Sequence, residues 1–237
     1  MPHEATITRL ARFAQDQWGL VTRRQADRAG VSPATIQRLA DGGLLERVAG
    51  GIYRLSGAPI SDHLDLRAAW LQLAPEVPAW ERTTDQGVVS HRSGAALYRL
   101  GHLPADVHEF TLPVRRQSRR PDVRLHRGKL EPAEHSTLGG LPVTRPARIA
   151  SDLLRDREDP QAVAHVVVDA IRGALDLPGT FADALSSHAA AFGLRRRDGV
   201  ALLRWLLDLV GDPDAKGWLD EARDHVARAA DGEAIGG

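Results

Sequence analysis

The sequence contains no cysteine, which excludes disulfides and thiolate metal sites. Its formal net charge at pH 7 is 0, so the chain as a whole gives no signal for a polyanionic partner, and any such signal must be local. No apolar run approaches the ~18 residues needed to span a membrane. The first residues, MPHEATITRL, lack the apolar core of a secretory signal. We therefore expect a cytoplasmic protein with no membrane partner.

Motifs that carry catalysis are also missing. The ten histidines show neither H-x-x-x-H nor H-E-x-x-H spacing, and there is no G-x-S-x-G and no P-loop. Ser90 and His91 are neighbours, but adjacency in sequence does not make a nucleophile and its base. The only acid-x-Lys match, Asp214-Ala215-Lys216, lies at an expected helix start. We predict no enzyme, no catalytic or metal-binding residue and no cofactor.

The stretch from Thr22 to Leu55 has the pattern of a winged helix-turn-helix. Thr22 and Gln25 have capping-box spacing, and the short helix after Thr22 should end at Gly30. Ser32 and Pro33 then start a second helix that ends at Gly42. Two short strands around Ala49-Gly50-Gly51 form the wing. A helical hairpin that only packs is the alternative.

The second helix should enter a major groove, because it exposes small polar and arginine side chains. Arginine bonds base edges and phosphates in bidentate fashion. The base contacts predicted here are Thr35, Gln37 and Arg38, and the phosphate contacts are Ser32, Arg47 and Arg54. Tyr53 lies beside the outward arginines of the wing, and the first helix of the pair adds Arg23 and Arg24 to the DNA-binding residues.

The rest of the chain predicts a mixed α+β domain that ends in a helical bundle, so the fold class is α+β and mostly α. We expect the winged helix over residues 1–57, the second domain over 58–230 and a disordered tail over 231–237. A first helix should cover about residues 5–17. Strands are expected at 107–114 and 123–130, a hairpin turn at 138–141, and helices from Ser61, Ser90, Pro146, Asp159, Thr180, Asp198 and Asp212 onward.

Residues 115–129 carry seven cationic side chains and a single acid, Asp122. A run of this kind is either a solvated loop or a surface that contacts phosphates. In the second interpretation the segment RRQSRR extends the DNA footprint beyond the winged helix, through Arg115, Arg116, Arg119 and Arg120. Sequence alone leaves both open.

Three landmarks follow one another in the chain: the wing strand GIYRL, then VVSHRSGAALYRLG at 88–101, then LGGLPVTRPARIASDLL at 138–154. In this order they resemble the AbiEi family of antitoxin regulators. The resemblance implies an antitoxin that binds operator DNA, represses its own toxin–antitoxin operon and counteracts a nucleotidyltransferase-like toxin through its second domain. Nuclease-fused relatives need metal-binding acids that this chain lacks.

Other functions stay open from the residues themselves. A plain winged-helix transcription factor would sense a ligand or a protein through its second domain, and its mark would be a closed apolar pocket in residues 60–155. An interaction protein would use the winged helix to bind protein, and it would show no affinity for its own promoter. An enzyme would need carboxylates converging on a metal.

Overall fold

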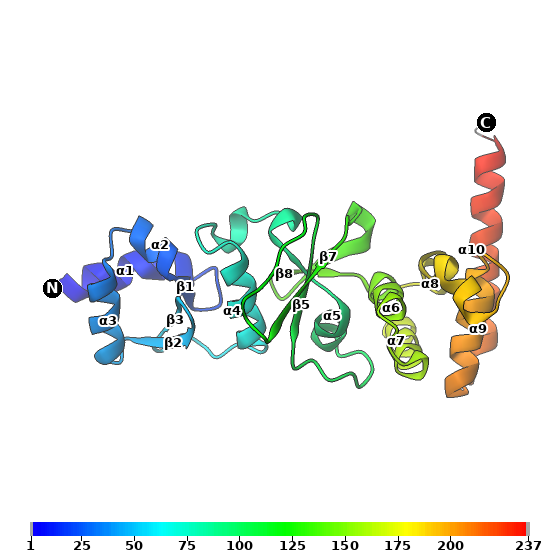
Figure 1. Ribbon diagram of the computed structural model, residues 1–237, viewed down its shortest axis with the longest axis horizontal. Coiled ribbons are helices and arrows are strands. Elements are labelled where there is room, and N and C mark those ends of the chain that lie inside the picture. The colour runs from blue at the N-terminus through cyan, green and yellow to red at the C-terminus, as the bar shows by residue number, and fades with distance from the viewer. Residues whose placement is uncertain (1, 236–237) are drawn as a thin grey trace. The chain divides into compact units, whose positions relative to one another are not determined.

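The computed structural model describes residues 2–235, and within them it shows ten α-helices and two small β-sheets (Figure 1). The fold class is α+β and mostly α, as the sequence predicts. The chain forms two compact units: residues 1–88 with 112–128, and residues 89–111 with 129–237. Among residues 2–235, no helix is both long enough and apolar enough to cross a membrane.

The first unit opens with the winged helix, whose elements are α1 (Pro2–Ala14), β1 (Leu20–Thr22), α2 (Arg23–Arg28), α3 (Pro33–Asp41), β2 (Leu45–Ala49) and β3 (Ile52–Leu55). Both predicted caps are present. The Thr22 hydroxyl accepts from the Gln25 backbone N–H at 3.0 Å, and the Thr22 backbone N–H donates to the Gln25 side chain at 3.0 Å. Ser32 accepts from the Thr35 backbone N–H at 3.2 Å, with Pro33 in the first turn. These bonds satisfy N–H groups that a helix start leaves open.

Strand β1 differs from the prediction, in which the first helix leads directly into the helix-turn-helix. It pairs antiparallel with β3, which also pairs antiparallel with β2, so the three strands form one sheet in the order β1-β3-β2. A strand of three residues is too short for alternation to reveal. The first helix begins and ends about three residues earlier than expected, and Gln17, whose side chain donates to Gln25 at 2.9 Å, belongs to the turn after it.

The core of the winged helix is one apolar cluster with buried members from α1, β1, α2, α3 and β2. Ile36 and Leu39 of α3 are 2% and 1% exposed, so one face of this helix is fixed by packing. Burying side chains of this size contributes about 1.5–3 kcal/mol each. The opposite face of α3 is thereby turned away from the core.

The first unit continues beyond the wing with α4 (Leu64–Leu73), η1 (Ala79–Glu81), η2 (Thr84–Gln86) and β6 (Val123–Arg127). Arg82 closes the C-terminal end of α4, where carbonyl groups lack helical partners. Its guanidinium donates to the carbonyls of Trp70, Leu71 and Ala74 at 2.5, 2.7 and 2.6 Å, and to Val77 at 3.2 Å. The Trp70 ring lies under it, 4.2 Å from the guanidinium carbon. The segment 75–87 is thus held to α4.

The second unit contains α5 (His91–Tyr98), β5 (His108–Leu112), η3 (Pro132–Glu134), β7 (His135–Leu138) and β8 (Leu141–Thr144). Strand β4 (Val88–Val89), at the division between the units, pairs in parallel with β8 through Val89 and Val143. Strands β7 and β8 form the predicted hairpin, with Leu138 opposite Leu141. The sheet has β5, β4, β8 and β7 as consecutive neighbours.

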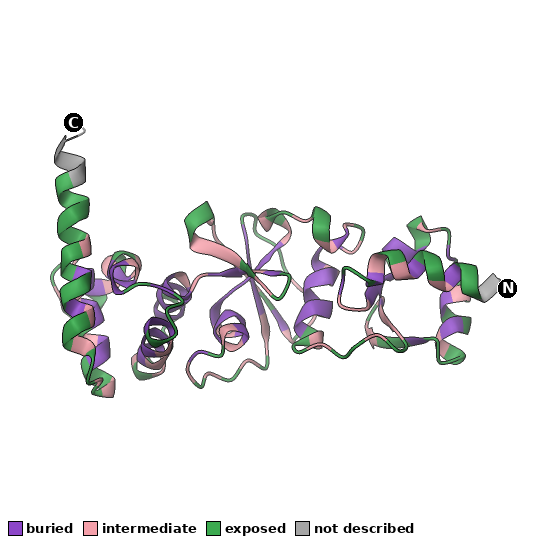
Figure 2. Ribbon diagram, turned by 180° about the vertical axis from the view of Figure 1, so that it is seen from behind, coloured by how far each residue is buried: buried purple, intermediate pink, exposed green. Residues whose placement is uncertain are grey.

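Five helices complete this unit: α6 (Pro146–Arg155), α7 (Pro160–Arg172), α8 (Pro178–Leu185), α9 (Gly199–Val210) and α10 (Ala215–Ile235), with η4 (Ser186–Phe192) between α8 and α9. The single helix expected from Thr180 to Ala191 is therefore α8 followed by a 3-10 helix. The faces of these helices share one large apolar core. Helix α10 is exposed along most of its described length (Figure 2). It continues to Ile235, through part of the expected tail; Gly236 and Gly237 lie outside the described residues.

Ser90 occupies the predicted N-cap position of α5, but its hydroxyl makes no capping hydrogen bond. The buried carboxylate of Glu109 accepts from the Arg92 backbone N–H instead, at 2.9 Å. The helix begins after Ser90, as predicted, but Glu109 provides the capping acceptor. The reason is that Glu109, distant in sequence, brings a stronger, charged acceptor to the same helix end.

Candidate DNA-binding surface

The exposed face of α3 carries the side chains that the sequence assigns to base contacts. Gln37 and Arg38 are exposed and Thr35 is half-buried, while Ile36 and Leu39 point into the core. Gln37 donates to Asp41 at 2.7 Å, and Arg38 donates to the Thr35 hydroxyl at 3.1 Å. Both bonds are exposed and join side chains of the same helix. Gln37 and Arg38 can each exchange this protein partner for a base edge at low energetic cost, because exposed polar pairs contribute little to stability.

The N-terminus of α3 and the wing contain the predicted phosphate contacts. Ser32 and Arg47 are exposed, and Tyr53 is half-buried against the core of the winged helix. Arg47 and Tyr53 face each other across β2 and β3. Arg47 is therefore a cationic wing side chain that is directly available to a ligand.

Arg54 differs from Arg47. The sequence predicts that Arg54 points outward, but its side chain is only 11% exposed. Its guanidinium forms an ion pair with Glu46 on the neighbouring strand at 2.5 Å and donates to the Ala58 carbonyl at 2.5 Å. The expected exposure of Arg54 was wrong, because the ion pair with Glu46 on the neighbouring strand and the bond to Ala58 cover its guanidinium. A DNA contact by Arg54 would require this pair to break.

The turn of the wing is held by the rest of the first unit. Gly51 has φ of +74°, a conformation that glycine adopts without a steric penalty. Its carbonyl accepts from the Arg23 backbone N–H at 2.8 Å, and the Gly50 carbonyl accepts from the Gln72 side chain of α4 at 2.7 Å. The wing is thus a short, fixed hairpin.

The structure brings the arginines of α2 close to those of the basic segment, residues 115–129. Arg23 and Arg24 line a pocket of about 650 Å³ with Arg116, Arg119 and Arg120, all within the first unit. Arg115 is exposed and does not belong to this lining. The run is therefore split between a pocket wall and an exposed end, an arrangement that spacing in the sequence cannot show.

Two arginines fix the basic segment to α4. Arg116 donates to the Leu73 carbonyl at 2.6 Å. Arg120 donates to the Gln72 side chain and pairs with Asp122, with 2.9 Å between Nε and a carboxylate oxygen. The hydrogen bond to Asp122 raises the pKa of Arg120. The segment is more than a freely solvated loop.

Sequence reasoning missed Gln72. It bonds both the wing turn and Arg120, and so connects the winged helix to the basic segment. Its polar side chain on a largely apolar helix was the only signal available in the sequence.

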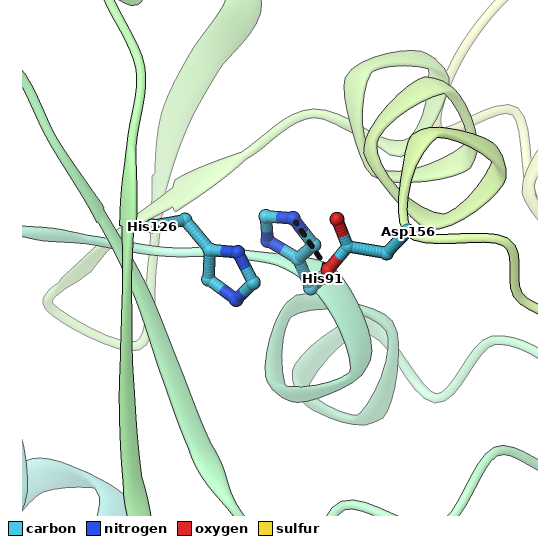
Figure 3. Close-up of side chains that lie close together, drawn as sticks. All are labelled: His91, His126 and Asp156. Atoms are coloured by element: carbon cyan, nitrogen blue, oxygen red, sulfur yellow. Dashed lines mark ion pairs between the residues drawn. The ribbon is translucent and has the colours of Figure 1, made fainter.

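In the second unit, Ser90 and His91 do contact each other, although adjacency alone did not predict it. His91 Nδ1 lies 2.9 Å from Ser90 Oγ, and Nε2 lies 3.8 Å from the carboxylate of Asp156 (Figure 3). The nitrogens are used in the opposite sense to a hydrolase triad, where Nε2 serves the serine. Ser90 has no exposed surface, and Thr111 donates to it at 2.9 Å. The contacts therefore link β5 to the start of α5 and offer a substrate no access to the hydroxyl.

Residues 9–56 match the family model described as transcriptional regulator, AbiEi antitoxin. The winged helix belongs to this family. The AbiEi match begins within α1 and ends just after β3, so it contains α2, α3 and the wing and no residue of the second unit. Comparison with curated proteins gave no match.

Proposed function

We propose that the protein is an AbiEi-like antitoxin that binds operator DNA and represses its own toxin–antitoxin operon. The observation that carries this proposal is the polar, exposed face of α3, which lies on a helix anchored by its other face in a domain of the AbiEi regulator family. A recognition helix needs both properties, because it must be rigid and must present donors and acceptors to base edges.

In the proposed complex α3 enters a major groove. Thr35, Gln37 and Arg38 contact bases, and arginine there suits the two acceptors of guanine. Ser32 and Arg47 contact phosphates on either side and set the register without reading sequence. The charges of the winged helix supply attraction to the backbone that weakens with added salt.

The proposal assigns no reaction to this chain. The second unit would counteract a nucleotidyltransferase-like toxin by binding it or by opposing its effect. Support for this half comes from the antitoxin family of the first unit and from the landmarks VVSHRSGAALYRLG and LGGLPVTRPARIASDLL, which form α5 with its flanks and β8 with α6.

The substitution Arg38→Ala tests the DNA-binding half. It should lower affinity for the operator by about 1–3 kcal/mol, because a bidentate base contact is lost. Arg12→Ala is the matched control, since Arg12 is also an exposed arginine but lies on α1, outside the helix-turn-helix. A gel-shift titration measures both. Equal loss for the two variants, or none for Arg38→Ala, would remove Arg38 from the DNA-binding surface.

A further inference from the structure

The pocket of the first unit differs from the binding sites that the sequence suggested. Its lining combines five arginines with apolar side chains, among them Ile52, Leu73, Val123 and Leu125. A volume of about 650 Å³ is in the range of small-molecule sites. It is neither the closed apolar pocket of a ligand-sensing second domain nor a flat basic surface.

Most of the arginines that line this pocket are not neutralised by acidic side chains. Among residues 2–235, the guanidinium groups of Arg23, Arg24 and Arg119 make no hydrogen bond or ion pair. Arg116 uses one donor on a carbonyl and keeps the others. Five arginines, less Asp27 in the lining and the Asp122 that neutralises Arg120, leave an excess of three positive charges.

An anion that matches this excess needs more than one phosphate group. A single phosphate monoester carries about −1.5 to −2 at neutral pH. The planar fork of arginine fits phosphate oxygens, and the same plane stacks on a nucleobase. The apolar side chains of the lining offer the rest of such a ligand a surface away from water.

A DNA duplex would use only part of the pocket. Its phosphates can reach the arginines, but a base fills a pocket only when it leaves the stack, which costs a few kcal/mol. A free nucleotide needs no such step. Hence we propose that this pocket binds a nucleoside polyphosphate, with the phosphates on Arg23, Arg24, Arg116 and Arg119 and the nucleoside against the apolar lining.

Binding of ATP to the full-length protein, measured by isothermal titration calorimetry, tests this proposal without any DNA present. Inorganic tripolyphosphate is the comparison ligand, and we expect it to bind about tenfold more weakly because it lacks the nucleoside. Arg119→Glu should weaken ATP binding by at least about tenfold. Arg115→Glu makes the same charge change in the same segment but outside the pocket lining, and it should leave the affinity within about twofold.

Three results would overturn the proposal: no ATP binding by the folded wild-type protein, equal affinity for ATP and tripolyphosphate, or equal loss in the two variants. Thermal melting of each variant verifies that it is folded. If ATP does not bind and Arg119→Glu instead weakens binding to duplex DNA, the arginines contact the DNA backbone. Because the calorimetry contains no DNA, its failure is separate from any failure of the operator-binding proposal.

Discussion

At the scale of single residues, side chains of one type serve different purposes according to their surroundings. Arg38 is exposed and donates to a hydroxyl and a carbonyl of its own helix, whereas Arg54 is covered and paired with Glu46. Both were predicted as DNA contacts from residue type and position. What distinguishes them is the surroundings. Strand register places the carboxylate of Glu46 next to Arg54, whereas Arg38 lies on the exposed face of a helix.

His188 should make the stability of the protein depend on pH. Its Nε2 lies 2.9 Å from the hydroxyl of Ser151, a buried residue of α6. Desolvation lowers the pKa of His188 below its ordinary value of 6.5, and the charge of Arg155 lowers it further, with Asp152 opposing. The unfolded chain therefore binds a proton more readily than the native state, so this histidine makes stability fall as the pH drops below about 6.5.

His188→Gln should weaken that dependence, because glutamine can bond Ser151 but does not titrate. Urea unfolding at about pH 7.5 and about pH 5.5 measures the difference. We expect the wild-type protein to lose more free energy of unfolding between the two than the variant loses. A loss in the variant that equals or exceeds the wild-type loss would contradict the account of His188.

At the scale of elements, local signals were readable and distant ones were not. Thr22 with Gln25, and Ser32 with Pro33, predicted both helix starts of the helix-turn-helix, because a cap and its partner lie within three residues. Glu109, which caps α5, comes from another element. The short strands β1 and β4 have no periodicity to detect, and their partners are far along the chain. The pocket formed by α2 and the basic segment is non-local in the same way.

Among the elements, we expect the largest loss of stability when Arg82, which closes the end of α4, is replaced. Burial lowers its pKa to about 10, with Glu76 opposing, so the group is still charged at neutral pH when it closes α4. Arg82→Ala should lower the free energy of unfolding by roughly 2–4 kcal/mol, because several carbonyls lose a charged donor at once.

Arg82→Lys separates charge from shape. Lysine keeps the charge but cannot span four carbonyls with a planar fork, so we expect an intermediate loss. Urea denaturation measures both variants. If alanine is tolerated within about 0.5 kcal/mol, as at an ordinary surface position, Arg82 does not hold segment 75–87 to α4.

At the scale of the whole molecule, the net charge is 0 but positive charge is concentrated in the first unit, where five arginines and one aspartate line the pocket. The proposed function divides two activities between the two units. The full-length variant Arg38→Glu tests this division, because it places a negative charge on the recognition helix and leaves the second unit unchanged. It should lose repression of a reporter under its own promoter and still rescue cells from the cognate toxin.

The control for this experiment is Arg12→Glu, which makes the same change on α1 and should retain both activities. Loss of rescue by a folded Arg38→Glu variant would show that neutralisation depends on the same surface as DNA binding. In that case the two activities are not divided between the units.

If α3 reads a DNA sequence, the protein must distinguish its own operator from other DNA. Fluorescence anisotropy compares the affinity of the full-length protein for the duplex upstream of its own operon with that for a scrambled duplex of equal composition, at one fixed salt concentration. Recognition by α3 predicts that binding to the upstream duplex is tighter by at least about 10³-fold, the lower end of the range for specific regulators. Equal affinity for the two duplexes, or no binding to either, would contradict it and would favour a winged helix that binds protein.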